Sequence, residues 1–243
     1  MPPGCPLQCE QYLSAVSQSP GVGFDLVSTT LYKTEDGGGS WHPVGTPLFI
    51  GPIVFASQTR GWEVSQGAGR LLRGELFLTT TGGSTWRQIA LPAAGDYAGI
   101  SASYALPTFF NADDGVLLAT FAQPRNGASP LVIYTTANGG RSWTAHPLPK
   151  AARISGHMNQ PQFSVLSSSA WFIADGQTLF GTSSAGVHWT IIKPRPAWPR
   201  TGVFSLLFTS ESTGFELRST TPQEAPALWR SINGGHSWTN ISS

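Results

Sequence analysis

The feature that most constrains the fold is a short polar motif that occurs five times and always ends in tryptophan. It reads Ser or Thr, any residue, a short polar residue, Gly or Ala, Gly, any residue, usually Ser or Thr, and Trp. Its copies are TEDGGGSW (34–41), TTTGGSTW (79–86), TANGGRSW (136–143), TSSAGVHW (182–189) and SINGGHSW (231–238). Because successive tryptophans stand 45, 57, 46 and 49 residues apart, the chain is an array of similar units.

Each position of the motif has a structural role. The third position holds a side chain that can accept hydrogen bonds from backbone N–H groups one or two residues on and so close a turn: Asp36, Thr81, Asn138, Ser184 and Asn233. The glycines after it supply the positive φ angles of a hairpin tip. The last position begins the returning strand, where an indole buries apolar area over the turn: Trp41, Trp86, Trp143, Trp189 and Trp238. The motif therefore predicts a self-contained β-hairpin.

These residues resemble the Asp-box, or BNR repeat, whose pattern is Ser/Thr-x-Asp-x-Gly-x-Thr-Trp. Only Asp36 keeps the aspartate, and Ala185 replaces the first glycine of the fourth copy. The resemblance implies that each copy is the outer hairpin of a β-propeller blade, between its third and fourth strands. Sialidases, xyloglucan-degrading hydrolases, sortilin-type receptors and photosystem II assembly-factor-like propellers have this arrangement. The chain is most similar to the last group, in which a Gly-Trp strand precedes each motif, as in FASQTRGWEV (55–64).

The segments between the motifs predict the rest of each blade. A strand, a polar turn and a second strand that opens with Phe24, Trp62, Val116, Trp171 or Phe215 precede each copy. A third strand leads into the motif and a fourth follows its tryptophan. We therefore expect an all-β, single-domain β-propeller of four-stranded antiparallel blades, either five-bladed or part of a larger ring. Its predicted blades are about 10–45, 46–92, 93–150, 151–195 and 196–243, with an insertion at 119–133 in the third.

Candidate binding residues lie on the second strands, which the resemblance places toward the central face of a propeller. When GFDL, GWEV, GVLL, AWFI and GFEL are aligned, acids fall at one place in three repeats: Asp25, Glu63 and Glu216. Converging carboxylates could hold a cation, bind sugar hydroxyls or supply the acid and base for glycoside cleavage. Alternatively, each acid is neutralised by a nearby arginine or faces solvent; the candidate partners are Arg60, Arg73 and Arg218. Trp198, in the proline-rich KPRPAWPRTG (193–202), either stacks on a ligand or fills the seam between two blades.

The enzymatic families that share the motif fit the sequence poorly. The resemblance to sialidases would require three arginines and a tyrosine–glutamate pair, but Arg-Ile-Pro is absent and no tyrosine pairs convincingly with a glutamate. Xyloglucan-type hydrolysis uses two aspartates between two large propellers, which one domain of this size cannot build. We therefore expect a non-catalytic binding or assembly scaffold without a cofactor. The alternative is a carbohydrate-active propeller, as a glycoside hydrolase or a glycan-binding protein.

Composition narrows the partners further. With 14 Lys and Arg against 13 Asp and Glu, the chain has no basic stripe for nucleic acid, and no apolar run is long enough to span a membrane. The expected partner is a protein or a glycan on the central face. The low charged fraction, 11%, is typical of exported bacterial propellers, so we expect an extracellular or periplasmic location, with a cytoplasmic one as the alternative.

The N-terminal segment MPPGCPLQC (1–9) does not resemble a signal peptide. Cys5 and Cys9 are spaced for a small disulfide loop or two free thiols, and the histidines match no metal-site spacing.

Overall fold

The computed structural model describes residues 11–15, 19–49, 51–65, 74–92, 100, 102–121, 131–147, 162–175, 177–198, 205–219 and 225–242. These residues form strands β1 to β21 and contain no helix. The chain divides into two compact units, 1–120 with 134–144 and 121–133 with 145–243. Arg73, Cys5 and Cys9, and most of the predicted insertion in the third blade, lie outside the described residues.

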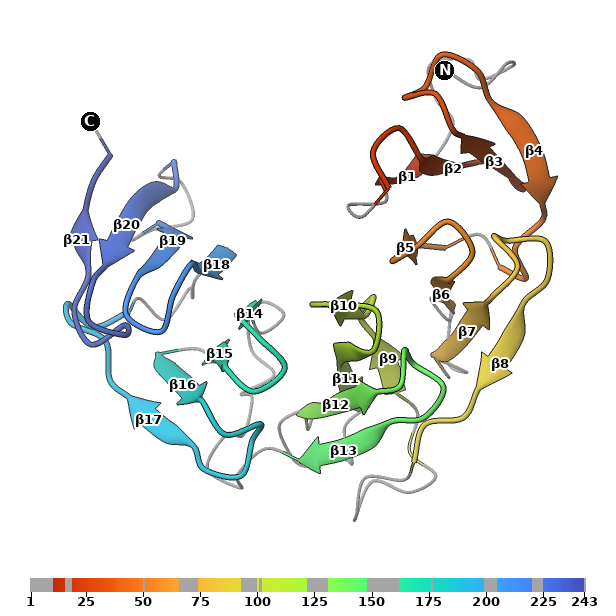
Figure 1. Cartoon of the computed structure of the whole chain (residues 1–243). Coiled ribbons are helices and arrows are strands. Elements are labelled where there is room, and N and C mark those ends of the chain that lie inside the picture. The colour runs from red at the N-terminus through yellow and green to blue at the C-terminus, as the bar shows by residue number, and fades with distance from the viewer. Residues whose placement is uncertain are drawn as a thin grey trace. The chain divides into compact units, whose positions relative to one another are not determined.

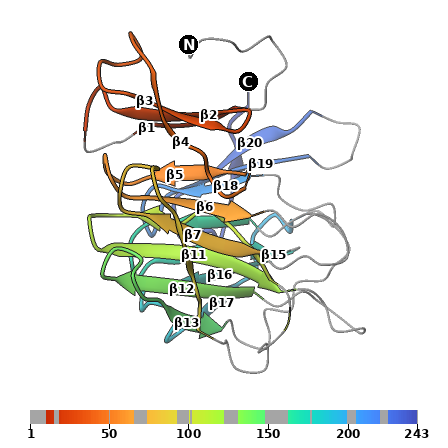
Figure 2. The ribbon, with the colours of Figure 1, turned by 90° about the vertical axis from the view of Figure 1, so that its right-hand side faces the viewer.

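Five antiparallel sheets account for all the strands, and each contains one copy of the motif (Figure 1). The first blade comprises β1 (Gln11–Ala15), β2 (Gly23–Val27), β3 (Thr30–Thr34) and β4 (His42–Gly45). The second comprises β5 (Ile53–Phe55), β6 (Gly61–Ser65), β7 (Glu75–Thr79) and β8 (Arg87–Ile89). Figure 2 shows β5, β6 and β7 side by side in sequence order. Neighbours in the chain are thus neighbours in each sheet, as the repeat pattern predicts.

The remaining sheets follow the same order. The third comprises β10 (Thr108–Phe109), β11 (Asp114–Phe121), β12 (Leu131–Ala137) and β13 (Thr144–Pro147), with β9 (Ala102–Tyr104) also paired to β11. The fourth comprises β14 (Gln162–Val165), β15 (Trp171–Asp175), β16 (Thr178–Thr182) and β17 (Thr190–Ile192). The fifth comprises β18 (Ser205–Phe208), β19 (Gly214–Arg218), β20 (Ala227–Ser231) and β21 (Thr239–Asn240). The predicted blade of four strands in sequence order is therefore confirmed in every repeat, and the third sheet has β9 as an additional strand.

Each motif closes the hairpin between its third and fourth strands with the same hydrogen bonds. The side chain at its third position accepts the N–H four residues on, at 2.9–3.0 Å, rather than the N–H one or two residues on that the sequence suggested. The first hydroxyl also accepts an N–H four residues on, at 2.9–3.2 Å. In addition, the N–H of the fourth residue donates to a carbonyl in the turn between the blade's first two strands, at 2.8–2.9 Å. This last bond ties the hairpin to the rest of its own blade.

The tryptophans complete the hairpins in four of the five copies. Their indole N–H groups donate to the carbonyl of the second glycine at 2.9–3.2 Å. In the fourth copy, the buried Nε1 of Trp189 has no hydrogen-bond partner among the described residues. The same copy holds Ala185 at φ 52°, a left-handed conformation that the glycines of the other copies adopt at less cost. The fourth hairpin is therefore the least favourable of the five.

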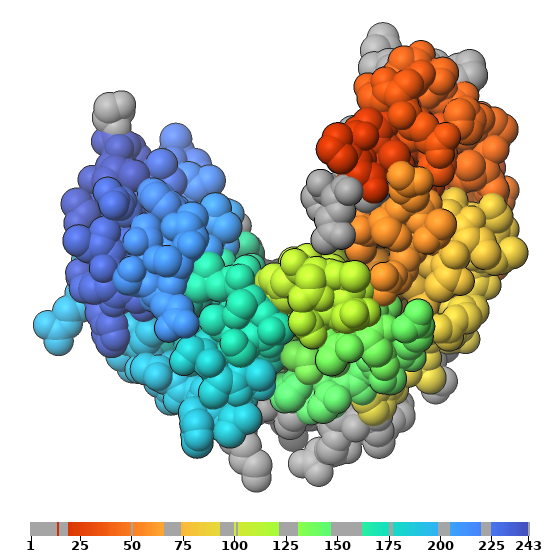
Figure 3. Space-filling model, in the orientation of Figure 1, coloured from red at the N-terminus to blue at the C-terminus, as the bar shows by residue number. Residues whose placement is uncertain are grey.

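Neighbouring blades within each unit are joined by pairs of stacked rings. An aromatic residue of one blade's second strand stacks on a phenylalanine of the next blade's first strand, with centroids 3.5–4.2 Å apart: Phe24 on Phe55, Trp62 on Phe109, and Phe172 on Phe208. The buried Ser14 and Ser164 hydroxyls add bonds across two of these seams by accepting the N–H groups of Phe55 and Phe208. Figure 3 shows the fourth and fifth blades in direct contact.

The stacked rings also correct the alignment of the fourth repeat. Trp171 lies opposite Thr182, the place that Gly23, Gly61 and Gly214 take in their own blades. In the second and fifth blades this glycine makes room for a ring of the adjacent first strand, since a Cβ on Gly61 would lie 2.6 Å from Phe55 and one on Gly214 would lie 2.7 Å from Phe208. The fourth blade instead has Val165 on its first strand, and the larger side chain of this pair, Trp171, lies on its second strand. Phe172, rather than Trp171, is therefore equivalent to Phe24 and Trp62, and the fourth second strand is displaced by one residue.

Candidate functional site

Glu63, on β6, holds the connection between the first and second blades. Its side chain is fully buried, and its carboxylate accepts the N–H groups of Leu48 at 3.1 Å and Phe49 at 2.8 Å. Burial raises the pKa of Glu63 to about 7, although the two backbone donors oppose the rise. The acid therefore fixes a chain segment that lies outside the sheet, and both of its oxygens are engaged.

Glu216, on β19, is buried together with Arg218. Its Oε1 lies 3.2 Å from Nε of Arg218, and the guanidinium stacks 3.7 Å from the centre of the Trp229 ring. Burial raises the pKa of Glu216 to about 7, while the Arg218 charge and the nearby Trp198 indole act in the opposite direction. Burial likewise lowers the pKa of Arg218. The structure thus brings Glu216 and Arg218 together as an ion pair, one of the arrangements that the sequence left open.

Asp25 and Arg60 both lie in the first unit but have different surroundings. Asp25, on β2, is buried; its Oδ1 has no hydrogen-bond partner among the described residues, and burial raises the pKa of its carboxyl. Arg60 donates from Nη1 to the carbonyl of Ala112 at 2.6 Å and so links the turns of the second and third blades. Arg60 therefore contacts backbone rather than one of the recurrent acids.

Trp198 lies in the seam between the fourth and fifth blades and is only 1% exposed. Its ring packs 6.0 Å from that of Trp238 and joins the core cluster with Leu206 and Phe208. The preceding segment is held as well, because Arg195 exchanges backbone hydrogen bonds with His236 and Trp238. The indole therefore fills the seam, the second role that its proline-rich surroundings suggested.

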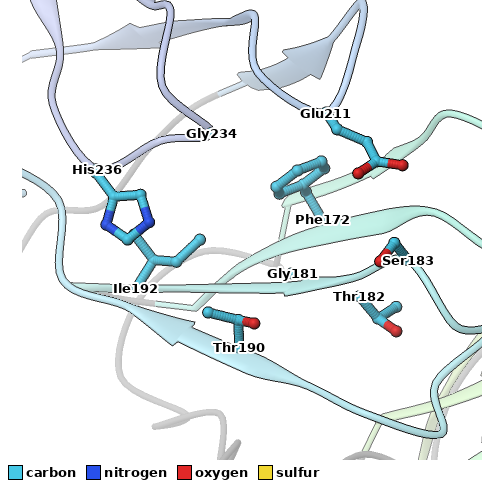
Figure 4. Close-up of a pocket in the computed structure, with 9 residues that line it drawn as sticks. All are labelled: Phe172, Gly181, Thr182, Ser183, Thr190, Ile192, Glu211, Gly234 and His236. Carbon is cyan, nitrogen blue, oxygen red and sulfur yellow. The ribbon is translucent and has the colours of Figure 1, made fainter.

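A pocket of about 200 Å³ opens between the fourth and fifth blades (Figure 4). Its walls combine two buried apolar side chains with a carboxylate, an imidazole and three hydroxyls: Phe172, Ile192, Glu211, His236, Thr182, Ser183 and Thr190. Figure 4 shows Glu211 and His236 at opposite ends of the lining, with His236 beside Ile192. The floor also includes Gly181 and Gly234. The pocket can accept one small polar or amphipathic group, and it contains a single carboxylate.

The sequence did not predict this pocket, because the pocket depends on one position where the fourth repeat has glycine and the other repeats have a larger residue. The residue just before each motif is Lys33, Leu78, Thr135, Gly181 or Arg230, so the fourth repeat alone has no side chain there. Comparing that column across the repeats would have identified the position.

The part of the chain that the structure describes contains no candidate metal site and no candidate membrane-spanning helix. No group of three or more His, Cys, Asp or Glu side chains there could hold an ion. Within the same residues, no helix has the length and apolar character needed to cross a bilayer.

Comparison with known proteins identifies the fold. No protein-family model matches the chain, and no curated protein matches it in sequence. Among solved structures, YCF48 bound to D1 peptide is similar over 95% of this chain and 66% of that one, with a TM-score of 0.57 and 15% identity. The GH74 xyloglucanase from Xanthomonas campestris is similar over 96% of this chain, with a TM-score of 0.62 and 15% identity. An ancestral GH74 enzyme gives a TM-score of 0.62, 12% identity and 98% coverage of this chain.

These structures establish a β-propeller fold for the chain, whose repeated sheets are its blades. The chain spans just under two thirds of the YCF48 structure, and 38% and 32% of the two GH74 structures.

Proposed function

We propose that the chain is a non-catalytic scaffold that binds a protein partner, similar in this respect to photosystem II assembly-factor-like propellers. The observation that carries the proposal is the burial of the recurrent acids. Glu63 binds two backbone N–H groups, and Glu216 faces Arg218 inside a blade seam. Both acids are at most 1% exposed. A glycosidase needs two carboxyl groups that reach one sugar from opposite sides, and these acids do not reach solvent.

The structural neighbours support two different functions, and the site favours the first. YCF48 was solved with a bound D1 peptide, whereas the neighbour from Xanthomonas campestris is a GH74 xyloglucanase. Because the identities are 15% or lower, these functions are possibilities for this chain only where its own residues support them. Its pocket offers one carboxylate, which suits binding rather than acid–base hydrolysis.

The second candidate is a glycan-binding propeller, and the hydroxyl-rich wall of the pocket favours it. Ser183 and Thr190 line the pocket together with Glu211, and such groups bind sugar hydroxyls; the Thr182 hydroxyl, also in the lining, already accepts the N–H of Gly186. However, the ring of Phe172 is stacked 3.6 Å from that of Phe208, so one face is not available to a sugar. The pocket, at about 200 Å³, is also smaller than typical ligand sites of roughly 300–1,000 Å³.

Two parallel screens of the purified chain test the proposed function. In the first, the protein is incubated with sialosides, β-glucans, xyloglucan and aryl glycosides, and we expect no hydrolysis. Turnover that disappears in the Glu63→Gln variant would contradict the scaffold function. In the second, the same labelled protein is applied to a peptide array and a glycan array. We expect saturable binding to peptides; binding confined to glycans would favour the second candidate.

A further inference from the structure

The pocket between the fourth and fifth blades exists because Gly181 replaces a side chain that the other repeats carry. Register defines the equivalence: Gly181 lies opposite Phe172 on β15, as Lys33 lies opposite Phe24 on β2. Gly181 is not among the glycines with positive φ, so its backbone does not require glycine. A Cβ there would lie 3.1 Å from Cε1 of Phe172 and 3.7 Å from Ile192, and thus point toward the pocket lining. The missing side chain is therefore the direct cause of the open space.

The first blade shows what occupies the equivalent space when a side chain is present. Nζ of Lys33 lies 6.0 Å from the centre of the Phe24 ring and 2.6 Å from Oε1 of Glu35. An alkyl stem and an ammonium group thus cover a phenylalanine edge and end on a carboxylate. In the fourth repeat, Phe172 takes the place of Phe24, and Glu211 supplies a carboxylate from the turn of the fifth blade. The pocket thus offers an aromatic ring and a carboxylate, the two kinds of group near Lys33; Glu211 comes from the next blade, whereas Glu35 belongs to the same motif, at the position where the fourth repeat has Ser183.

We propose that this pocket receives a lysine side chain from a partner polypeptide, which names a contact for the protein-binding function proposed above and rests on it. Phe172 and Ile192 face the alkyl stem, Glu211 pairs with the ammonium group, and the hydroxyls of Ser183 and Thr190 replace part of its water. Lysine rather than arginine is proposed because Lys33 occupies the equivalent position in the first blade, opposite Phe24, with its ammonium group near that ring. His236, at the opposite end beside Ile192, lies away from Glu211 (Figure 4).

The test uses a single lysine as the probe. The ¹⁵N-labelled full chain is titrated with the peptide Ac-Gly-Lys-Gly-NH₂ and followed by amide NMR. We expect saturable shifts at Gly181, Ser183 and Gly234, with a Kd on the order of 1–10 mM, as one small contact gives. The matched peptide with norleucine in place of lysine keeps the stem but lacks the charge. It is expected to bind at least about threefold more weakly, since the pairing with Glu211 is lost.

Three variants separate this pocket from general charge attraction. Gly181→Lys supplies the side chain internally, as Lys33 does in the first blade, and should abolish the shifts. Glu211→Gln, an exposed change that leaves the core untouched, should weaken the lysine peptide at least about threefold. Leu207→Lys adds the same charge as Gly181→Lys at a 57% exposed position of β18 that does not line the pocket, and should leave the shifts unchanged.

Several outcomes would overturn the proposal. These are the absence of saturable shifts, equal binding of the norleucine peptide, unchanged binding in Gly181→Lys, or displacement of the lysine peptide by methyl β-glucoside. A chain that binds peptides on the array but ignores this probe contradicts the lysine pocket alone. Hydrolysis of a glycan, by contrast, contradicts the proposed function whatever the pocket binds.

Discussion

The motif hairpins and the seams between blades place their acids in opposite environments. In the first hairpin, Asp36 is exposed and accepts hydrogen bonds from the N–H and hydroxyl of Ser40 and from the hydroxyl of Thr34. These donors hold the pKa of Asp36 below its ordinary value. The seam acids Glu63 and Glu216 are buried, and burial raises the pKa of each to about 7. The hairpin thus favours the charged form of its acid, whereas the seams oppose it.

The other copies show that the hairpin forms without the aspartate, as long as an acceptor occupies its position. In the other copies, Thr81, Asn138, Ser184 and Asn233 accept the same backbone N–H with an uncharged oxygen. The hairpin needs an acceptor at this position, and the charge is an addition. In the seams, Glu63 instead satisfies two N–H groups of an irregular segment, which a shorter side chain would not reach.

The largest expected effect comes from removing a buried hairpin tryptophan. Trp143 is 6% exposed, donates to the carbonyl of Gly140, and contacts the ring of Phe109 edge-on. Trp143→Ala should therefore lower the free energy of unfolding by about 3–5 kcal/mol. Trp86→Ala in the second blade tests the same role with a smaller expected loss, because Trp86 is only partly buried although its ring contacts Phe55; both variants are measured by urea denaturation.

The control for this change is Trp41→Ala, because Trp41 makes the same indole bond but is only partly buried. Its loss should be smaller. Wild-type denaturation midpoints for both Trp86→Ala and Trp143→Ala would show that the tryptophans do not stabilise the hairpins.

A smaller loss should follow removal of one hairpin hydroxyl. The Thr136 hydroxyl is buried, accepts the N–H of Gly140 at 3.0 Å and that of Asn138 at 3.3 Å, and donates to Oδ1 of Asn138. Thr136→Val keeps the shape but leaves these groups unsatisfied, so unfolding should become easier by about 1–3 kcal/mol. Thr144→Val, at an exposed position of the same blade, is the control. Equal stability of the two variants would sink the assigned role of the hydroxyl.

The smallest effect is a gain of stability in the fourth hairpin. Ala185 is held at φ 52°, where glycine carries no Cβ penalty. Ala185→Gly should therefore raise the free energy of unfolding by about 0.5–1 kcal/mol, observed as a higher melting temperature. The converse change, Gly82→Ala in the second hairpin at φ 67°, should lower it. A loss of stability in Ala185→Gly would mean that the backbone strain is not what weakens this copy.

The sequence predicted the hairpins well because their contacts are local. A hydroxyl, a short polar side chain and two glycines within five residues determine the turn, and these letters can be read directly. The predicted hydrogen-bond donors were wrong, because the side chain at the third position accepts the N–H four residues further along the chain rather than one or two. The partners of Glu63 could not be predicted, because Leu48 and Phe49 lie about 15 residues away in an irregular connection.

The displacement of the fourth repeat and the pocket were missed for a common reason. Both depend on differences in side-chain size at neighbouring positions of paired strands. Trp171 stands where other repeats have glycine, and it lies opposite Val165, where the second and fifth blades have phenylalanine; the pocket opens because Gly181 replaces a lysine, leucine, threonine or arginine. Such exchanges become visible only when the strands are paired.

The central claim is that Glu63 and Glu216 are buried parts of the fold rather than solvent-facing site residues, and the pH dependence of unfolding tests it most directly. An acid whose pKa is raised on folding stabilises the native state fully below its unfolded value, and loses that contribution as pH rises through its folded value. For Glu63 and Glu216 the window runs from the ordinary 4.5 to about 7. Burial lowers the pKa of His146, which acts in the opposite direction but equally in all variants. Differences between variants therefore isolate the acids.

The measurement is the free energy of unfolding between pH 5 and 8.5 for the wild type, Glu63→Gln, and Glu63→Gln with Glu216→Gln. Each removed acid should make the decline with rising pH less steep, and the double variant should show the shallowest curve, because glutamine does not titrate. Three curves that run parallel across this range would contradict the account, since the acids would then titrate as if they were exposed in the folded chain.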